Sequence, residues 1–491
     1  MSESPPASEP TRWPDYRAVW RWHFYASLFC MPFVIVLSIS GAIYLFKPQI
    51  EAYLDRPYDQ LAITGELASV ADQVRAAVAA VPNGAASGYE LRASETSAAR
   101  VLVRAGGQTH RVYVHPQTRE VLHQVPEDQR LMRWMFKLHG ELLLGDRGSN
   151  IVEIAACWTI VMLLTGLFLW WPRKTNRGAG VVYPRLRQGS RIMWRDLHSV
   201  TGFWIVGCAL LLLATGLPWA KFWGNYFKAV RRWTGTAVAQ QDWTTGSERG
   251  AQRGGDEGGR EGGGGGHEGH GGHGDHGGNS ASDSSPQPGE GKAANGKAAR
   301  RPPPTVDLTG FDRVVAVVTP LQLEHPVVIS PPSRGGDKWS AKSQTQNRPL
   351  RVNLVVDGRS GEILSREDYR DRHWVDRVMG VGIAAHEGQL FGWPNQLIGL
   401  LTAGGLVLLC VSGLMMWWRR RDPGTLGAPA ARQPGRFSWL LLAIILALAI
   451  YLPLFGATLV AVLAIEWLVL KRIPRLRDWL GLPNFATTTG G

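Results

Sequence analysis

One spacing between histidine and tryptophan occurs twice in this chain, and it constrains the fold more than any other feature. His139 precedes the Trp-Trp pair that begins at Trp170 by 31 residues, and His386 precedes the pair that begins at Trp417 by the same number. Both pairs end long apolar runs. A fixed interval between the same residue types in two halves of a chain indicates an internal duplication.

A second spacing, between histidine and glycine, is also repeated. His23 precedes Gly41 by 18 residues, and His198 precedes Gly216 by 18. The duplicated unit therefore carries four histidines in register, each near the end of an apolar run. Histidines in equivalent positions at membrane boundaries are what a protein needs to hold haem iron through axial ligands.

The overall hydrophobic content of 45% is ordinary, but the apolar residues are gathered into long runs. Four runs have about the length that a helix needs to cross an apolar layer of roughly 30 Å, and they cover residues 29–46, 151–171, 203–220 and 397–418. A fifth run, 437–470, is interrupted near Pro453. It predicts a tight hairpin of two short helices.

Positive charges predict the orientation of these spans. Arginine and lysine crowd the segments that follow the second, fourth and last apolar runs, which places those segments in the cytoplasm. The first 28 residues lack the pattern of a cleavable signal peptide, so the first span is expected to direct insertion. We predict a multi-pass protein of the bacterial inner membrane with a cytoplasmic N-terminus. The net charge of +13 follows from topology and requires no nucleic acid partner.

The two long external segments predict two small α+β domains. The first combines a helical pattern over residues 66–81 with alternating strands near 100–103 and 110–115. In the second, residues 356–364 align without a gap to 114–122. The predicted fold class is a helical membrane protein. It has four core transmembrane helices, a C-terminal hydrophobic hairpin and two periplasmic α+β domains arranged as a duplication.

The predicted boundaries follow from these patterns. They are a cytoplasmic tail 1–18, first span 19–47, first periplasmic domain 48–130, surface helix and second span 131–171, basic loop 172–195, third span 196–220, periplasmic segment with an insertion 221–305, second periplasmic domain 306–372, surface helix and fourth span 373–418, cytoplasmic loop 419–436, hydrophobic hairpin 437–470 and cytoplasmic tail 471–491.

The insertion, about residues 244–304, is rich in Gly, Ser, Pro and charged residues, and we expect it to be disordered. Within it, histidine recurs every third residue, at His267, His270, His273 and His276. Clustered imidazoles bind Zn²⁺, Ni²⁺ or Cu²⁺ readily. These four residues are therefore the predicted metal-binding residues.

Several motifs resemble the PepSY-associated membrane proteins. They are Trp-His-Phe-Tyr-Ala at 22–26, His-Gly-Glu-Leu-Leu-Leu-Gly at 139–145, Asp-Leu-His-Ser-Val-Thr-Gly at 196–202 and His-Glu-Gly-Gln-Leu-Phe-Gly at 386–392. The resemblance covers about residues 19–470 apart from the insertion, and it gives the name PepSY-like to the two external domains. It implies a role in bacterial iron uptake, in which some members resemble di-haem reductases of ferric siderophores.

The predicted topology assigns the histidines to pairs. Opposite ligands of one haem must share a depth, so His23 should face His198 near the inner surface and His139 should face His386 near the outer surface. Two bis-histidine haem b groups would then form an electron path. Taken singly, a histidine at a membrane interface is more often an amphipathic anchor. Glu153, inside the second span, is a further candidate, either for haem propionates or proton uptake or as a group that reaches the headgroups.

The sequence thus predicts a di-haem b protein that passes electrons outward to reduce ferric iron, in a siderophore or another chelate. Haem ligation requires no acid–base catalyst. No nucleotide-binding motif is present, so the electron donor would be separate, a membrane quinol or a cytoplasmic reductase. The alternative is a non-redox metal-binding or accessory protein of metal uptake. A transporter is the weaker third candidate, because few charged residues lie in the spans.

Overall fold

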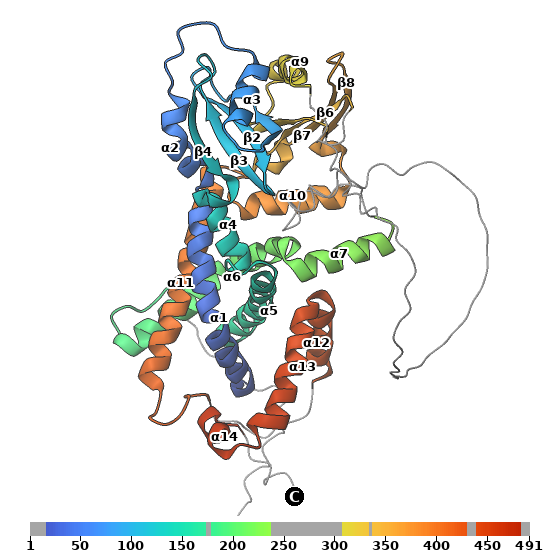
Figure 1. Ribbon diagram of the computed structural model, residues 1–491. Helices are drawn as coiled ribbons and strands as arrows, with labels where there is room; N and C mark the ends of the chain where they lie inside the picture. Colours follow the sequence, from blue (N-terminus) through green and yellow to red (C-terminus); the bar gives the residue numbers. More distant parts are fainter. Residues whose placement is uncertain (1–15, 173–177, 237–306, 333–335, 430–437, 483–491) are drawn as a thin grey trace, which may run out of the picture.

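The computed structural model describes residues 16–172, 178–236, 307–332, 336–429 and 438–482. Within them, long helices form a bundle at one end of the molecule and a β-sheet lies at the other (Figure 1). The histidines predicted to bind metal, His267 to His276, fall outside the described residues.

Five of the described helices are long and apolar enough to cross a membrane. They are α1 (Tyr16–Leu45), α5 (Gly145–Trp170), α6 (Ser190–Gly216, continued by a short turn to Trp219), α11 (Trp393–Arg420) and α13 (Pro453–Ile465, continued to Leu470). Helices satisfy all backbone hydrogen bonds internally, which the interior of a lipid bilayer requires. The chain is therefore a multi-pass membrane protein. The four spans expected from the apolar runs are present, and the C-terminal run supplies the fifth.

The C-terminal run folds as the expected helical hairpin. Helix α12 (Trp439–Tyr451) is followed by the buried Leu452, and α13 begins at Pro453. Proline suits the first position of a helix because it lacks the backbone N–H that would have no partner there. The indole of Trp158 on α5 donates to Thr458 on α13 over 3.0 Å, which joins the hairpin to the bundle. Helix α14 (Pro474–Leu480) follows.

The bundle shows the duplication directly. Helix α1 packs along α5, and α6 packs in the same way along α11, while α1–α11 and α5–α6 contacts close the bundle. Four shorter helices connect it to the sheet, and they are α2 (Lys47–Asp59), α4 (Leu131–Glu141), α7 (Lys221–Trp233) and α10 (Trp374–His386). Helices α7 and α10 run crosswise between the sheet and the C-terminal hairpin (Figure 1).

Two buried charged contacts hold α7 in place. Arg231 on α7 pairs with Asp376 on α10 over 2.7 Å. Glu153 on α5 accepts the backbone N–H groups of Phe222 and Trp223 in the first turn of α7, at 3.0 and 3.1 Å. Glu153 therefore caps a helix, where its negative charge also favours the positive end of the helix dipole. Its side chain is buried, at 1% exposure.

The two long segments between the spans, which were expected to form two small α+β domains, together form one antiparallel sheet of eight strands. The strands are β1 (Ala85–Glu90), β2 (Ala99–Ala105), β3 (Gln108–Val114), β4 (Val121–Pro126), β5 (Val327–Ser330), β6 (Lys338–Ser343), β7 (Val352–Asp357) and β8 (Ile363–Asp368). Their order is β4-β3-β2-β1-β5-β6-β7-β8. Strands β1 and β5 join the two halves, with Tyr89 opposite Ile329 and Glu90 opposite Val328.

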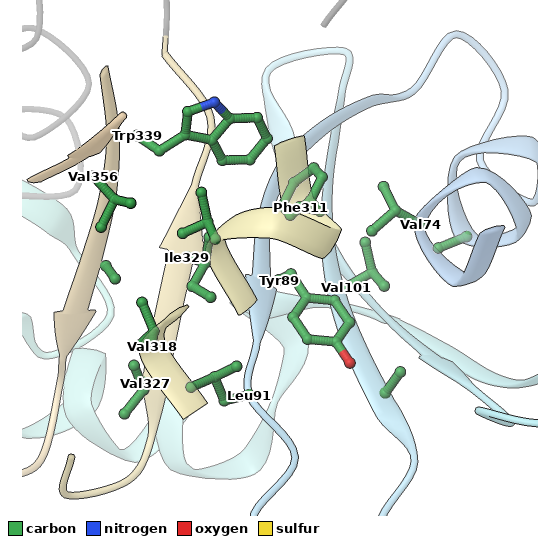
Figure 2. Packing of buried hydrophobic residues seen from close by; sticks show 14 of the residues in the cluster. Val74, Tyr89, Leu91, Val101, Phe311, Val318, Val327, Ile329, Trp339 and Val356 are labelled. Atoms are coloured by element: carbon green, nitrogen blue, oxygen red, sulfur yellow. The ribbon is translucent and has the colours of Figure 1, made fainter. Parts of the chain in front are cut away.

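One hydrophobic core serves both halves of the sheet. Helices α3 (Val70–Ala79) and α9 (Thr309–Val318) pack against each other and against the buried faces of the strands. The fully buried Phe311 of α9 has its ring centre 4.7 Å from Trp339 in its own half and 6.4 Å from Tyr89 in the other (Figure 2). Separation of the two halves of the sheet would expose this core to water, which explains why β1 pairs with β5 and the sheet is continuous.

Phe311→Ala should therefore destabilise both halves together. Removing this ring leaves a cavity that costs about 3–5 kcal/mol. Hydrogen exchange in detergent-solubilised protein should accelerate in β2 and in β7 alike, while Ile363→Ala, at a half-exposed position on β8, should leave both unchanged. Faster exchange in β7 alone would mean that the halves unfold independently.

Candidate functional site

One histidine pair, called the outer pair because it lies nearer the sheet, consists of His139 on α4 and His386, the last residue of α10. Their ring centres are 6.2 Å apart and the ring planes are inclined by 71°. Each ring arrives from a short helix that follows the end of one half of the sheet, β4 for His139 and β8 for His386. The sheet therefore helps to set the distance between the two rings.

The other pair, called the inner pair because it lies farther from the sheet, consists of His23 on α1 and His198 on α6. Their ring centres are 6.3 Å apart and the planes are almost perpendicular, at 88°. Both residues lie in the long helices of the bundle. The structure thus brings together the same two pairs that were expected from the topology.

Each outer imidazole is anchored on the neighbouring long helix through Nδ1. Nδ1 of His139 lies 3.0 Å from the carbonyl oxygen of Leu37 and 3.2 Å from the hydroxyl of Ser40, both on α1. Nδ1 of His386 lies 2.8 Å from the carbonyl oxygen of Leu212 and 3.2 Å from the hydroxyl of Thr215 on α6.

The inner imidazoles repeat this arrangement. Nδ1 of His23 lies 3.0 Å from the Met162 carbonyl oxygen and 3.1 Å from the Thr165 hydroxyl on α5. Nδ1 of His198 lies 3.1 Å from both the Leu409 carbonyl oxygen and the Ser412 hydroxyl on α11. In all four cases the carbonyl precedes the hydroxyl residue by three positions, so one backbone geometry serves every site.

These contacts fix which ring nitrogen carries the proton. A backbone carbonyl oxygen can only accept a hydrogen bond, so Nδ1 must donate and must bear the hydrogen in a neutral imidazole. The lone pair then belongs to Nε2. A histidine held in this way is prepared to bind a metal through Nε2, with its orientation set by the second-shell contact.

A glycine follows each hydroxyl residue, and the docked imidazole lies against it. A Cβ atom would lie 2.9, 3.1, 3.2 or 3.5 Å from Cε1 of the docked histidine at Gly41, Gly166, Gly216 and Gly413, respectively. The described structure shows that these glycines admit the rings of the histidines.

The separation of the rings suits one metal ion between each pair. A metal–imidazole bond is about 2 Å long and the ring centre lies about 1 Å farther, so two opposed imidazoles have centres roughly 6 Å apart. Among the described residues, no group of three or more His, Cys, Asp or Glu could hold a metal ion by itself. Two histidines leave most positions around iron to another ligand, which a porphyrin supplies.

A cavity adjoins the outer pair. It measures about 1450 Å³ including the space that opens to the surroundings, and both His139 and His386 line it. Most of the other lining residues are apolar, among them Leu37, Leu406 and Trp219. An apolar cavity that two imidazoles border, with glycines beneath the rings, fits a flat, largely apolar cofactor such as haem.

The outer histidines lie outside the five candidate spans, and burial favours their neutral form. Burial and the facing His139 lower the pKa of His386 from 6.5 to about 4, and burial lowers the pKa of His139 as well. Both rings are therefore neutral at pH 7, and the neutral ring is the form that binds metal.

Sequence reasoning missed the four hydroxyl residues that orient the rings, which are Ser40, Thr165, Thr215 and Ser412. The signal was present, because each precedes one of the glycines already noted, in a Ser-Gly or Thr-Gly dipeptide within an apolar run. The intervals of 18 residues marked the repeat, but they did not identify contacts. His23 docks beside Gly166 and not beside Gly41.

Gly41→Ala should displace His139, because the added methyl group would meet the ring at 2.9 Å. Overpacking of this kind costs about 1–3 kcal/mol. The matched control is Gly140→Ala, at the residue next to His139, where an added methyl group meets no atom within 4 Å. Thermal unfolding in detergent should show a lower melting temperature for Gly41→Ala alone. Equal melting temperatures would contradict the close docking of the ring.

Comparison with protein families gives one match. The family model described as PepSY-associated TM region matches residues 20–420. This range includes all four paired histidines and both halves of the sheet. No curated protein matches the chain.

Proposed function

The chain belongs to the PepSY-associated TM region family, and from this premise we propose that it is a di-haem b protein that passes electrons across a membrane and reduces ferric iron. His139 and His386 would bind one haem near the outer surface, and His23 and His198 would bind the second near the inner surface. In the cell, the reduced iron would come from a ferric siderophore or a similar chelate during iron uptake.

One observation carries the proposal. Four imidazoles form two pairs with ring centres 6.2 and 6.3 Å apart, and each ring has its Nδ1 held by a backbone carbonyl group. This geometry leaves Nε2 of both members of a pair available for the same metal. Histidines that only anchored the chain at the membrane interface would have no reason to face one another across this distance twice.

The protein would contribute orientation and surroundings, and bound haem would supply a one-electron Fe³⁺/Fe²⁺ couple. The carbonyl and hydroxyl groups around Nδ1 would hold the rings and make them stronger donors. The apolar lining near Leu37 and Leu406 would keep water away from the metal. Such surroundings set the redox potential of a haem as much as its ligands do.

Ferric iron in a chelate suits this chemistry as a substrate. Hard oxygen donors bind Fe³⁺ tightly and Fe²⁺ much less tightly, so transfer of one electron promotes release of the metal. Neither proton transfer nor a covalent intermediate is needed. The outer site would act by bringing a reduced haem close to the chelate.

We place the protein in the bacterial inner membrane with its N-terminus in the cytoplasm and the sheet in the periplasm. The arginine-rich segments around Arg187 and Arg419 support this orientation. Electrons would enter at the inner pair, from a membrane quinol or from a cytoplasmic reductase, and leave at the outer pair.

His139→Ala and His386→Ala should each remove the outer haem and leave the inner one. Protein purified after haem-replete expression should lose about half of its haem absorption, because each bis-histidine site needs both ligands. His123→Ala, at an exposed position on β4, serves as the control and should retain both haems. Absence of haem absorption from the wild-type protein would refute the proposal.

Reduction of a ferric chelate provides the second test. The protein is reduced with dithionite, freed of excess reductant and mixed with a ferric siderophore in a stopped-flow instrument. The absorption of reduced haem should decay as the chelate accepts electrons, and His386→Ala should slow this decay at least tenfold.

The alternative is a non-redox accessory protein that binds metal through His267, His270, His273 and His276. Deletion of residues 262–278 separates the two functions. It should leave the haem content and the decay unchanged if the protein is a reductase. Loss of metal uptake in cells carrying this deletion, for a protein whose wild type shows no such decay, would favour the accessory role.

A further inference from the structure

Two charged residues occupy the same position relative to the inner histidines, and both are buried. Arg21 precedes His23 by two residues on α1, and Asp196 precedes His198 by two residues on α6. Their exposed fractions are 8% and 0%. The two residues have opposite charges, so each needs a different kind of partner.

Asp196 binds the segment that follows α5, residues 178–189. Its carboxylate accepts the backbone N–H of Arg185 at 3.1 Å, Nε of the same residue at 2.7 Å and Nη2 at 3.2 Å, and Arg195 adds a contact at 2.8 Å. This segment is also held to the end of α5, because the Trp170 indole donates to one of its carbonyl groups over 2.9 Å. Asp196 therefore ties the segment after α5 to the start of α6.

Arg21 binds the segment that follows α11, residues 421–429. Nη1 of Arg21 donates to the Pro429 carbonyl oxygen and, over 2.9 Å, to the Gly481 carbonyl oxygen at the end of α14. A guanidinium carries several N–H donors and can bind both groups at once. This segment is also held to the end of its long helix, because the Trp417 indole donates to one of its carbonyl groups over 2.9 Å. Arg21 therefore ties the segment after α11 to the start of α1.

These two links and the two histidine contacts form a closed cycle around the inner pair. His23 on α1 docks on α5, and the segment after α5 is bound by Asp196 on α6. His198 on α6 docks on α11, and the segment after α11 is bound by Arg21 on α1. Each long helix is thereby joined to the next one in the cycle. Opening one link would let the two inner rings move apart while the other contacts remain.

We propose that Arg21 and Asp196 are positioning residues, which hold the two inner imidazoles at the separation that a haem requires. They act through the segments that they bind. This proposal rests on the proposed function, since it takes a haem to lie between the inner histidines. Groups that orient a metal-binding histidine from beyond the ligands change metal affinity by roughly 10–100-fold.

Arg185→Ala opens one link without altering a helix of the bundle. The side chain of Arg185 is 30% exposed, and its removal leaves Asp196 paired with Arg195, so the variant should fold. The variant is made in the His139→Ala background, which should retain the inner haem alone. Haem transfer to excess apomyoglobin should be about tenfold faster than in the background protein. The low-spin EPR spectrum, which reports the angle between the two imidazole planes, should shift as well.

Three further variants in the same background complete the experiment. Arg185→Lys keeps one charged donor for Asp196 and should give an intermediate rate. Arg187→Ala, at an exposed position two residues away, is the matched control and should equal the background protein in rate and spectrum. Arg21→Ala opens the other link, while the Tyr25 hydroxyl still donates to α14, and it should also shift the spectrum. An unchanged rate and spectrum in both Arg185→Ala and Arg21→Ala would overturn the proposal.

Hydrogen exchange in the full-length, haem-free protein separates failure of this proposal from failure of the proposed function. Arg185→Ala should accelerate exchange in residues 194–202 of α6 as well as in residues 178–189, and Arg187→Ala should change neither. Faster exchange in residues 178–189 alone would mean that Asp196 fastens a loop without positioning α6, which contradicts the proposal. Absence of haem from the wild-type protein would instead refute the proposed function, and the exchange rates would still show whether the link holds α6.

Discussion

The contact between Nδ1 of a histidine and a backbone carbonyl group on the neighbouring helix organises this protein. It occurs four times, and the same helices take part on both sides. Helix α1 provides His23 to α5 and receives His139 from α4, while α6 provides His198 to α11 and receives His386 from α10. Helices α1 and α6 thus each contribute one histidine to a neighbouring helix and hold the histidine of another. The two histidine pairs share these helices, so their geometries depend on one packing arrangement.

The geometry of the outer histidine pair also depends on the sheet, which lies outside the bundle. Because β1 pairs with β5, the two halves form a single body, and each half leads through a short 3₁₀ turn into the helix that carries an outer histidine. The distance between α4 and α10 is therefore set from the sheet side as well as from the bundle. The inner histidines lie on the long helices α1 and α6 themselves, and they are held by α5 and α11. A sheet divided into two independent domains would let the outer pair separate.

The spans, the repeat and the pairing of the histidines could be predicted, because apolar length and spacing are properties of the sequence itself. The joining of the two halves into a single sheet could not be predicted. Strand β1 reads Ala-Ala-Ser-Gly-Tyr-Glu and β6 reads Lys-Trp-Ser-Ala-Lys-Ser, and small and polar residues in these segments hide the alternation that marks a strand. The two halves of the sheet are joined by backbone hydrogen bonds between β1 and β5. Backbone pairing leaves no pattern of side chains in the sequence. The hydroxyl groups near the histidines were marked only by a Ser-Gly or Thr-Gly dipeptide in each apolar run, and serine and threonine are common in membrane helices.

The two halves differ where they meet the outer cavity. In the first half, α2 packs on the sheet through charge, with Arg100 2.7 Å from Asp59 and the hydroxyl of Tyr113 2.9 Å from Asp55. In the second half, α7 follows the equivalent span, but it pairs with α10 through Arg231. The loop of residues 344–351, which joins β6 to β7 and includes the buried Arg348, contacts α10. A strictly symmetric protein would offer the same surface on both sides of its histidines. The asymmetry instead sets this loop against the helix that ends in His386, one of the two facing histidines.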